Sequence, residues 1–237
     1  MIDVNYDCRI ECPNRDPDSH SPTLRRFHKL LWSKELPCGK IFELDDSGPK
    51  PWLVHKSELG EFHLTSDAIV HLLGARLLLD QLPRQQRDFV EGIAWPVSEC
   101  IVFPGKRVNR LNTINGARGM NPRIADRFDL TLECIRRHYL GSCSPLSEVL
   151  RRYASFFTLF ESFEGYTHFF HLGGLVDPKS GGVRFYLPLE DFNRSGKPQS
   201  LDEYVLYLEN VEAFTIDRAA KMTQWCKQFL SINRLLE

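Results

Sequence analysis

The chain has 237 residues, a formal net charge of −1 and a pI near 6.7. This balance removes the electrostatic argument for non-specific binding to nucleic acid or to a membrane surface. No apolar run approaches the roughly 18–20 residues that a membrane-spanning helix needs. The seven cysteines are scattered without a C-x-x-C pair, which disfavours a zinc ribbon or a thioredoxin-type site. With no secretory signal at the N-terminus, we expect a reduced, cytoplasmic protein.

The first third of the chain predicts a helix between short strands. A short strand is expected at residues 2–8. Ser21 and Pro22 then have the residue types of an N-cap and a first helical position, so they open the first helix. Alternating polar and apolar residues predict a small antiparallel meander of three strands, at residues 41–44, 51–57 and 61–66. Asp67 is expected to cap a helix over residues 68–82.

The middle of the chain predicts a strand, a loop and a long helix. A helix is expected over residues 83–93, and the clearest strand of the chain covers residues 98–105. A glycine-containing loop follows at residues 112–119. Asn121 is then the expected N-cap of an amphipathic helix over residues 122–139, with proline at its first position.

The C-terminal part is mostly helical by its pattern. A helix is expected over residues 145–163, a strand over 183–189, a flexible linker over 193–200 and a helix over 201–236 with a break near Asn210. Six phenylalanines in one region are expected to belong mainly to the core because aromatic side chains bury much area, and they are Phe156, Phe157, Phe160, Phe163, Phe169 and Phe170.

Together these patterns predict an α+β fold. A small antiparallel sheet packs against a larger helical portion, and the C-terminal half is rich in helix. The length suits a single domain over residues 1–237. The alternative is two lobes, a mixed α/β lobe over residues 1–120 and a mostly helical lobe over residues 121–237.

The loop from Asn112 to Gly119 is the first candidate site. Its glycines let the backbone approach a ligand closely, and an arginine fork suits a carboxylate or a phosphate. We therefore expect Asn112, Asn115 and Arg118 to hold an anionic group beside a helix N-terminus. The spacing matches neither a phosphate-binding P-loop nor a dinucleotide motif. The alternative is that the asparagines satisfy a turn and that Arg118 pairs with an acid such as Asp126.

The first helix presents a second candidate surface. Arg25 and Lys29 lie among further basic residues with Trp32 between them. Basic residues interleaved with an aromatic side chain suit a nucleotide, whose base stacks and whose phosphates are paired. We expect Arg25 and Lys29 to close the anion site. The alternative is an ordinary solvated basic helix face.

Three residues are candidates for acid–base chemistry, namely Glu133, His138 and His55. For Glu133 the alternative is an i,i+4 pair with Arg137 on a solvated helix face. His55 and His63 on one hairpin do not supply the three or four converging ligands of a metal site, so no metal site is predicted. The sequence assigns no cofactor.

Several phrases resemble an uncharacterised bacterial protein family, a domain of unknown function. They are DPDSHSPTLRRFHKLLWSK with LPCGK, VHKSELGEFHLTSD, IVFPG, TINGARG and IADRFDLTLECIRRHYLG, which extend from Asp16 to Gly141. The resemblance implies a shared fold and a shared site. It transfers no activity, cofactor or catalytic residue, so function has to be argued from the residues.

We expect a soluble bacterial protein that binds a small anionic molecule, with a nucleotide or a phosphorylated metabolite as the leading class. The sequence does not decide whether the protein catalyses a reaction. If it does, transfer or hydrolysis at a phosphate or glycosidic bond suits the residues better than redox chemistry. The alternative is a non-catalytic interaction or regulatory module, as in stress or phage-defence loci. Its basis is the aromatic second half, which as an exposed surface would form a homo-oligomer.

Overall fold

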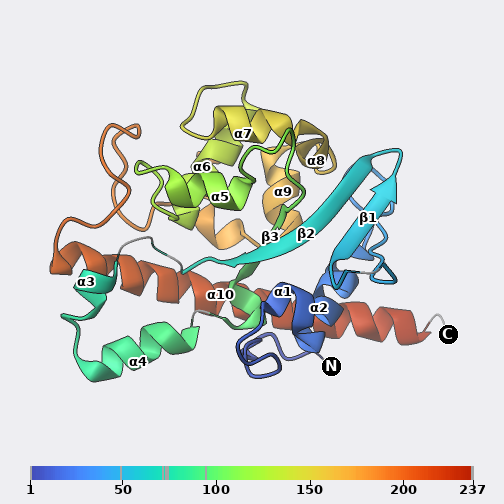
Figure 1. Ribbon diagram of the computed structural model, residues 1–237, viewed down its shortest axis with the longest axis horizontal. Coiled ribbons are helices and arrows are strands. Elements are labelled where there is room, and N and C mark those ends of the chain that lie inside the picture. Colours follow the sequence, from blue (N-terminus) through green and yellow to red (C-terminus); the bar gives the residue numbers. More distant parts are fainter. Residues whose placement is uncertain (1, 49, 71, 73–74, 94, 236–237) are drawn as a thin grey trace.

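The computed structural model describes residues 2–48, 50–70, 72, 75–93 and 95–235. Over these ranges the chain has an α+β fold with a three-stranded antiparallel sheet (Figure 1). The strands are β1 (Leu53–Ser57), β2 (Gly60–Ala68) and β3 (Cys100–Pro104). The helices before β3 are α1 (Pro17–His20), α2 (Pro22–Trp32), α3 (Arg76–Leu79), α4 (Arg84–Ile93) and the 3-10 turn η1 (Val97–Glu99). Those after it are α5 (Ile114–Met120), α6 (Phe128–Tyr139), α7 (Ser147–Arg152), α8 (Ala154–Thr158), α9 (Phe163–Phe169), the 3-10 turn η2 (Gly173–Leu175) and α10 (Leu201–Leu235).

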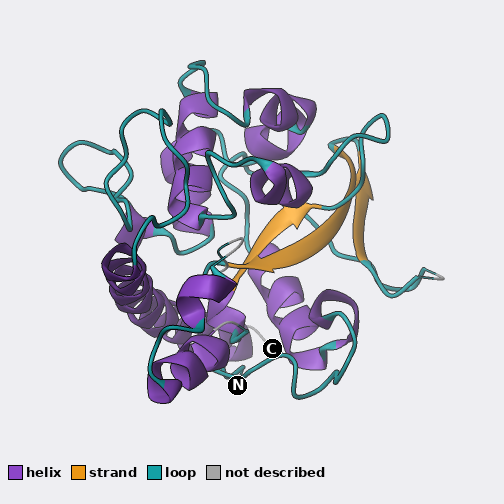
Figure 2. Cartoon of the chain, turned by 60° about the vertical axis from the view of Figure 1, so that its left-hand side comes forward, coloured by secondary structure: helices purple, strands orange, loops and turns teal. Residues whose placement is uncertain are grey.

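The sheet is a twisted meander in the order β1-β2-β3 (Figure 2). β1 and β2 form a tight hairpin that closes at the Ser57–Gly60 pair, where Gly60 has a φ of +124°. Glycine adopts this conformation without a steric cost. β2 then pairs with β3 through its residues Leu64 to Ala68. All five residues of β3 are buried, as the continuous apolar run of that strand predicts.

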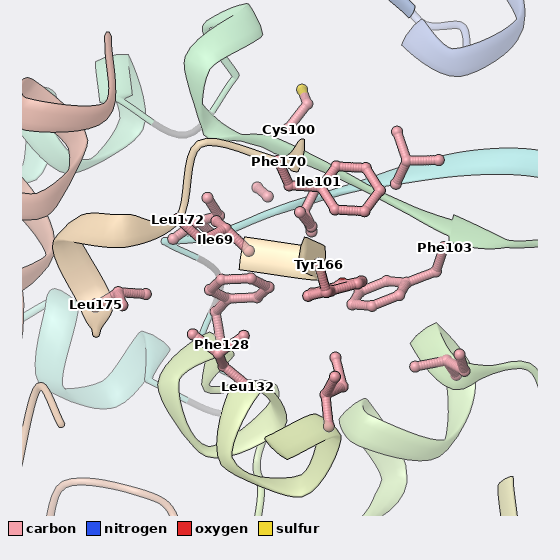
Figure 3. Packing of buried hydrophobic residues seen from close by; sticks show 14 of the residues in the cluster. Ile69, Cys100, Ile101, Phe103, Phe128, Leu132, Tyr166, Phe170, Leu172 and Leu175 are labelled. Carbon is pink, nitrogen blue, oxygen red and sulfur yellow. The ribbon is translucent and has the colours of Figure 1, made fainter. Parts of the chain in front are cut away.

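Helices cover the sheet on both sides. In Figures 1 and 2 the group α5 to α9 lies on one side, and α1, α2 and α10 lie on the other. One cluster of buried hydrophobic residues connects these layers and takes members from both halves of the chain. Figure 3 shows part of it, where Ile101 and Phe103 of β3 gather with Phe128 of α6 and Tyr166 of α9. The core thus forms around β3, which was the clearest strand in the sequence.

The expected aromatic core is confirmed. Five of the six phenylalanines are at most 2% exposed, and they are Phe156, Phe157, Phe160, Phe169 and Phe170. Their rings meet edge to face or tilted, at centroid distances of 5.0–5.5 Å. Trp32 of α2 packs against four of these rings and ties the N-terminal helix to the cluster.

The predicted first helix is confirmed as α2. The Ser21 hydroxyl accepts the N–H of Leu24, and Pro22 occupies the first turn. The strands predicted at residues 2–8 and 41–44 are wrong. The first segment makes one isolated bridge, Asp7 with Pro96, and the second makes none itself among the described residues, where the nearest bridge joins Asp45 to Val54. Short apolar runs without a continuous partner strand do not become strands.

The predicted helix over residues 68–82 is wrong where the structure describes it. Asp67 does not cap a helix, because β2 continues to Ala68 and the N–H of Ile69 still bonds to Glu99 O. Helix α3 is the only helical part of this segment among its described residues. His71, Leu73 and Gly74, on which the same prediction falls, lie outside the described residues.

The segment predicted as the loop 112–119 is mostly helix α5. The Thr113 hydroxyl caps it by accepting the N–H of Gly116 at 3.3 Å. Asn121 is the C-cap of α5 instead of the N-cap of the next helix. Its side-chain oxygen accepts the N–H of Arg123 at 2.9 Å and so stabilises a turn.

The long helix predicted over residues 122–139 begins only at Phe128, as α6. Ala125 and Asp126 have φ values of 51° and 68°, and a right-handed helix cannot pass through two left-handed residues. The expected end is confirmed, since Gly141 has a φ of +66° directly after the helix.

The remaining C-terminal predictions have mixed outcomes. The helix expected over residues 145–163 is broken into α7, α8 and the start of α9, with Glu161 at a positive φ of 61°. The strand expected over residues 183–189 is wrong, because Val183 makes one bridge with Val176. The last helix is confirmed as α10, but it continues through Asn210 without a break. None of the described helices is long and apolar enough to cross a membrane.

The segment predicted as a flexible linker packs directly on the turn before α6. The N–H of Gly196 donates to Pro122 O at 3.0 Å, and Arg127 Nη1 donates to Gly196 O at 3.3 Å. A Cβ at Gly196 would lie 2.6 Å from Ile124 O and 2.8 Å from Arg123 O. These are closer than van der Waals contact, so the glycine is required for the approach.

Replacing Gly196 with alanine is therefore expected to lower the free energy of unfolding by about 1–3 kcal/mol, as overpacking does elsewhere. Gly92 provides the matched control, because it is exposed in α4 and a Cβ there would meet no atom within 4 Å. Gly92→Ala should stabilise by up to about 1 kcal/mol through helix propensity. Urea unfolding of both variants measures the difference. A Gly196→Ala protein as stable as the wild type would restore the linker prediction.

Candidate functional site

Arg118 lies at the centre of a buried ion network. Its side chain is 0% exposed, and its Nη1 pairs with Asp67 of β2 and with Asp126 Oδ1, the latter at 3.2 Å. Nε donates to Thr131 Oγ1 at 3.0 Å, and Nη2 donates to Asp126 O. Each nitrogen of the guanidinium is thus already bonded. This geometry favours the ion-pair alternative for Arg118, and its ligand role stays a prediction.

Asn115 of α5 and Asn112, which precedes that helix, also have partners within the protein. Asn115 Nδ2 donates to Thr65 Oγ1 at 3.4 Å, and Asn112 Nδ2 lies 3.2 Å from Met120 Sδ. The structure therefore brings Asn115 and Arg118 to the face of β2, where they join α5 to the sheet.

Glu133 and His138 lie apart from that network, on α6. Both Glu133 carboxylate oxygens are bonded, with Arg136 Nε at 2.7 Å and Arg137 Nε at 2.9 Å, and the side chain is 4% exposed. His138 packs against Phe157, and burial followed by the charge of Arg151 lowers its pKa. Neither residue lines the cavities described below. As acid–base candidates they stay untested.

His55 lines a cavity of about 550 Å³ on the outer edge of the sheet, which we call the His55 pocket. Strand β1 forms its floor, and the segment that precedes β1 forms its wall. Its lining is Ile41, Glu43, Asp45, Gly48, Lys50, Trp52, Val54, His55, Lys56, Ser57 and His63. β1 is an edge strand of the sheet, and the backbone groups of Val54 at this edge bond to Asp45 of the wall.

The wall of the pocket is held by Arg25 and Lys29. Asp46 Oδ2 accepts from Arg25 Nη2 at 3.0 Å and from Lys29 Nζ at 2.8 Å, and Arg25 Nη1 also donates to Pro51 O. These two ion pairs lower the pKa of Asp46, with Lys29 as the larger cause. The structure thus places Arg25 and Lys29 against Asp46, the neighbour of Asp45 in the pocket lining, and neither basic residue lines the pocket itself. They act on its wall through Asp46.

His55 and Ser57 form a hydrogen-bonded pair within this pocket. His55 Nδ1 lies 2.9 Å from Glu43 O, and Nε2 lies 2.7 Å from Ser57 Oγ. A carbonyl oxygen only accepts, so Nδ1 of the neutral ring carries the hydrogen and Nε2 accepts from the Ser57 hydroxyl. The ring is 3% exposed and stacks on Phe42 at 3.6 Å. A hydroxyl bonded to an imidazole whose other nitrogen is bonded to a carbonyl is an arrangement suited to nucleophilic chemistry.

The pocket also holds two lysines that form no ion pair with a described residue, and Lys56 lies opposite Glu61 in the hairpin, where its charge adds to that of Lys106 in lowering the pKa of that carboxyl. Among the described residues, no carboxylate lies within ion-pair distance of Lys50 or Lys56; Lys50 Nζ lies 4.4 Å from the centroid of the Trp52 ring. Of the two acids in the lining, Asp45 is engaged by the N–H and hydroxyl of Ser47, which lower its pKa. The positive charges of Lys50 and Lys56 favour an anionic ligand in the pocket.

An aromatic wall completes the pocket. The Trp52 and His63 rings lie 5.1 Å apart on the outer face of the hairpin. His63 Nε2 contacts Glu61 Oε1 at 3.1 Å, and Lys106 Nζ contacts the same oxygen at 2.9 Å. Within the part of the chain that the structure describes, no three His, Cys, Asp or Glu side chains converge on a metal position.

A family model matches residues 2–222 of the chain, and its description is "family of unknown function (DUF6994)". The chain belongs to DUF6994. The match confirms the resemblance seen in the sequence and extends it past Gly141 into α10. No curated protein and no solved structure matches the chain. DUF6994 is a family of unknown function, so the chemistry has to be argued from the site.

In this DUF6994 chain, sequence reasoning singled out His55 as an acid–base candidate and His63 on the same hairpin, and both line the pocket, but it missed the lysines and the tryptophan beside them. Lys50, Trp52 and Lys56 were not predicted because the wall is irregular and carries no periodic pattern. The available signal was H-K-S on an edge strand, where alternate side chains, His55 and Ser57, share one face.

Proposed function

We propose that the protein binds a small phosphorylated molecule in the His55 pocket and that Ser57 accepts its phosphoryl group. The observation that carries this proposal is the 2.7 Å contact between Ser57 Oγ and His55 Nε2, in a cavity that Lys50 and Lys56 also line. A cytoplasmic location and a bacterial source remain part of the proposal.

The residues support a two-step reaction. Ser57 Oγ attacks phosphorus while its proton passes to His55 Nε2, and the bond from phosphorus to the leaving oxygen breaks. The leaving oxygen takes the proton from His55. Water, or an acceptor hydroxyl in a transferase, then releases the phosphoryl group from Ser57 by the same proton path in reverse. The Glu43 carbonyl accepts the Nδ1 hydrogen and stabilises the imidazolium between the steps.

The residues that line the His55 pocket indicate the class of substrate. Lys50 and Lys56 would neutralise phosphate oxygens, and the Trp52 and His63 rings offer a stacking surface for a base. A nucleoside phosphate satisfies both parts, whereas a sugar phosphate uses only the lysines. Nucleotides are therefore the leading class.

Binding is tested by calorimetric titration of nucleoside mono- and diphosphates and a sugar phosphate into the wild type and two variants. Lys56→Gln is expected to weaken nucleotide binding about tenfold or more, since a charged hydrogen bond contributes roughly 1.5–3 kcal/mol. Lys40→Gln is the matched control, because Lys40 is half exposed, pairs with Glu58 at 3.2 Å and lies outside the pocket lining. Equal affinities in both variants would contradict the proposed binding site.

Catalysis is tested separately by mass spectrometry of the protein after incubation with the bound nucleotide. A phosphoryl adduct on Ser57 is expected, and Ser57→Ala should retain binding while losing the adduct and turnover. Binding that persists in the wild type without any adduct or turnover would remove the catalytic half of the proposal and leave a binding protein.

The interaction-module alternative receives no specific support. It was based on an exposed aromatic surface in the second half of the chain, and five of the six phenylalanines there are buried in the core. The large exposed apolar side chains belong to separate segments, for example Ile41, Leu77, Met120 and Ile216.

A further inference from the structure

A second cavity of about 550 Å³ lies where three distant segments meet, and we call it the Lys34 pocket. The segment after α2, the end of α9 and the last turns of α10 surround it. Its lining is Lys34, Glu35, Leu36, Pro37, His168, Phe169, His171, Lys221, Gln224, Trp225 and Gln228. It shares no residue with the His55 pocket.

Lys34 occupies an unusual position in this pocket. Its Nζ donates to Phe169 O at 2.6 Å and lies 4.2 Å from the centroid of the Phe169 ring and 5.0 Å from that of Trp225. Among the described residues, no carboxylate oxygen lies within ion-pair distance of this nitrogen, whereas its neighbour Lys221 pairs with Asp217 at 2.5 Å. Lys34 is only partly exposed, and its amine lies against two rings with no counter-ion among the described residues, whereas charges withdrawn from water are normally paired.

The surroundings of the amine disfavour its charged form. Burial lowers the pKa of Lys34 to about 7, and the Cys226 thiol opposes this in part. The carbonyl of Phe169 and the two ring faces interact favourably with the ammonium form, so they also oppose the lowering of the Lys34 pKa. The other titratable groups that line the pocket are Glu35, His168, His171 and Lys221. The pKa of His171 is lowered to about 3 by its own burial and by Lys34, so its ring stays neutral.

We propose that Lys34 is a nucleophilic amine that forms an imine with an aldehyde or ketone held between Phe169 and Trp225. A desolvated lysine amine in an apolar pocket has this reactivity. The exposed rim of Gln224, Gln228 and His168 offers hydrogen bonds to the polar end of such a compound. The site is independent of the nucleotide proposal, because it uses different residues and a different ligand chemistry.

The reaction balances without a redox partner. The Nζ lone pair attacks the carbonyl carbon, the carbonyl oxygen takes a proton, and the nitrogen loses one, which gives a carbinolamine. A second proton converts the hydroxyl group into water as leaving group, and the nitrogen lone pair forms the C=N bond. Water is the only by-product, and the imine is released by the reverse steps.

The test uses pyridoxal as the probe aldehyde with the full chain at neutral pH, followed by borohydride reduction and peptide mass mapping. Reduction fixes each imine as a stable secondary amine, so the rate at each lysine is measured in one sample. Lys34 is expected to be modified about tenfold or more faster than Lys221, because a larger fraction of its amine is neutral. Lys221 is the matched control, since it lines the same cavity but is ion-paired.

Two variants make the outcome decisive. Lys34→Arg keeps the positive charge and should abolish the fast modification while Lys221 reacts at its wild-type rate. Trp225→Leu should slow modification at Lys34 and leave other lysines unchanged. Modification of Lys34 no faster than Lys221 in the wild-type protein would overturn the proposal, and this comparison requires no variant to fold.

Discussion

Replacing Arg118 with methionine is expected to lower the free energy of unfolding by about 3–5 kcal/mol, as removal of one partner from a buried ion pair does. The substitution leaves Asp67 and Asp126 without their shared guanidinium and removes the donors to Thr131 Oγ1 and Asp126 O. Methionine fills much of the volume, so most of the loss is electrostatic. Urea unfolding followed by tryptophan fluorescence measures it.

The control for this experiment is Arg123→Met. Arg123 lies in the turn that follows α5 and is exposed, and a surface substitution of this kind usually changes stability by less than about 0.5 kcal/mol. The two variants together separate the two interpretations of Arg118. A stable Arg118→Met protein that no longer binds anions would identify a ligand-binding arginine and contradict the structural assignment.

Replacing Glu99 with glutamine is expected to stabilise the protein at neutral and alkaline pH. Glu99 is 0% exposed, and burial raises its pKa from 4.5 to about 7, with Thr215 and Arg218 opposing the rise. Between these two values the folded protein holds a proton that the unfolded chain has lost. Wild-type stability therefore falls as pH rises through this window, and the loss is complete above the folded pKa.

Glutamine carries no titratable proton, so Glu99→Gln escapes this loss. The difference from the wild type should be near zero at pH 4 and grow to at most about 3 kcal/mol above pH 7. Unfolding midpoints at several pH values measure it. Glu148→Gln is the control, because Glu148 is 83% exposed and should show no such rise. A pH-independent difference for Glu99→Gln would show that the carboxyl ionises as freely in the folded protein as in the unfolded chain.

The parts of the fold that were predictable are those where local patterns and tertiary contacts agree. Ser21 and Pro22 began α2 as their cap chemistry predicts, and the apolar run of β3 became the buried strand. The alternation in residues 51–66 gave the hairpin. The α+β class follows from these elements together with the helical period of α10.

The region from α5 to α6 could not be predicted, for two physical reasons. Gly116 and Gly119 have low helix propensity and indicated a loop, but burial of Ile114 and Arg118 overrides that preference. Ala125 and Asp126 adopt positive φ, which their residue types do not indicate, and this turn delays the start of α6 to Phe128.

The candidate site was predictable only in part, because its residues meet through a hairpin edge and an irregular wall. His55 was identified from its residue type alone. Arg25 and Lys29 were correctly singled out as basic residues of one face, yet their partner Asp46 lies in a segment without periodic pattern. No spacing rule connects α2 to that wall, so their pairing with Asp46 could not be predicted.

The long helix α10 determines whether a shorter fragment of the chain can fold by itself. At about 1.5 Å per residue, its 35 residues extend over roughly 50 Å. Arg218 in this helix donates to Ser98 O, Cys100 O and Phe170 O, and Asn210 donates to Tyr186 O. A fragment that stops before Leu201 would leave these carbonyls unpaired beneath an exposed apolar surface. Such a fragment should be recovered in folded form only when a peptide corresponding to α10 is supplied with it.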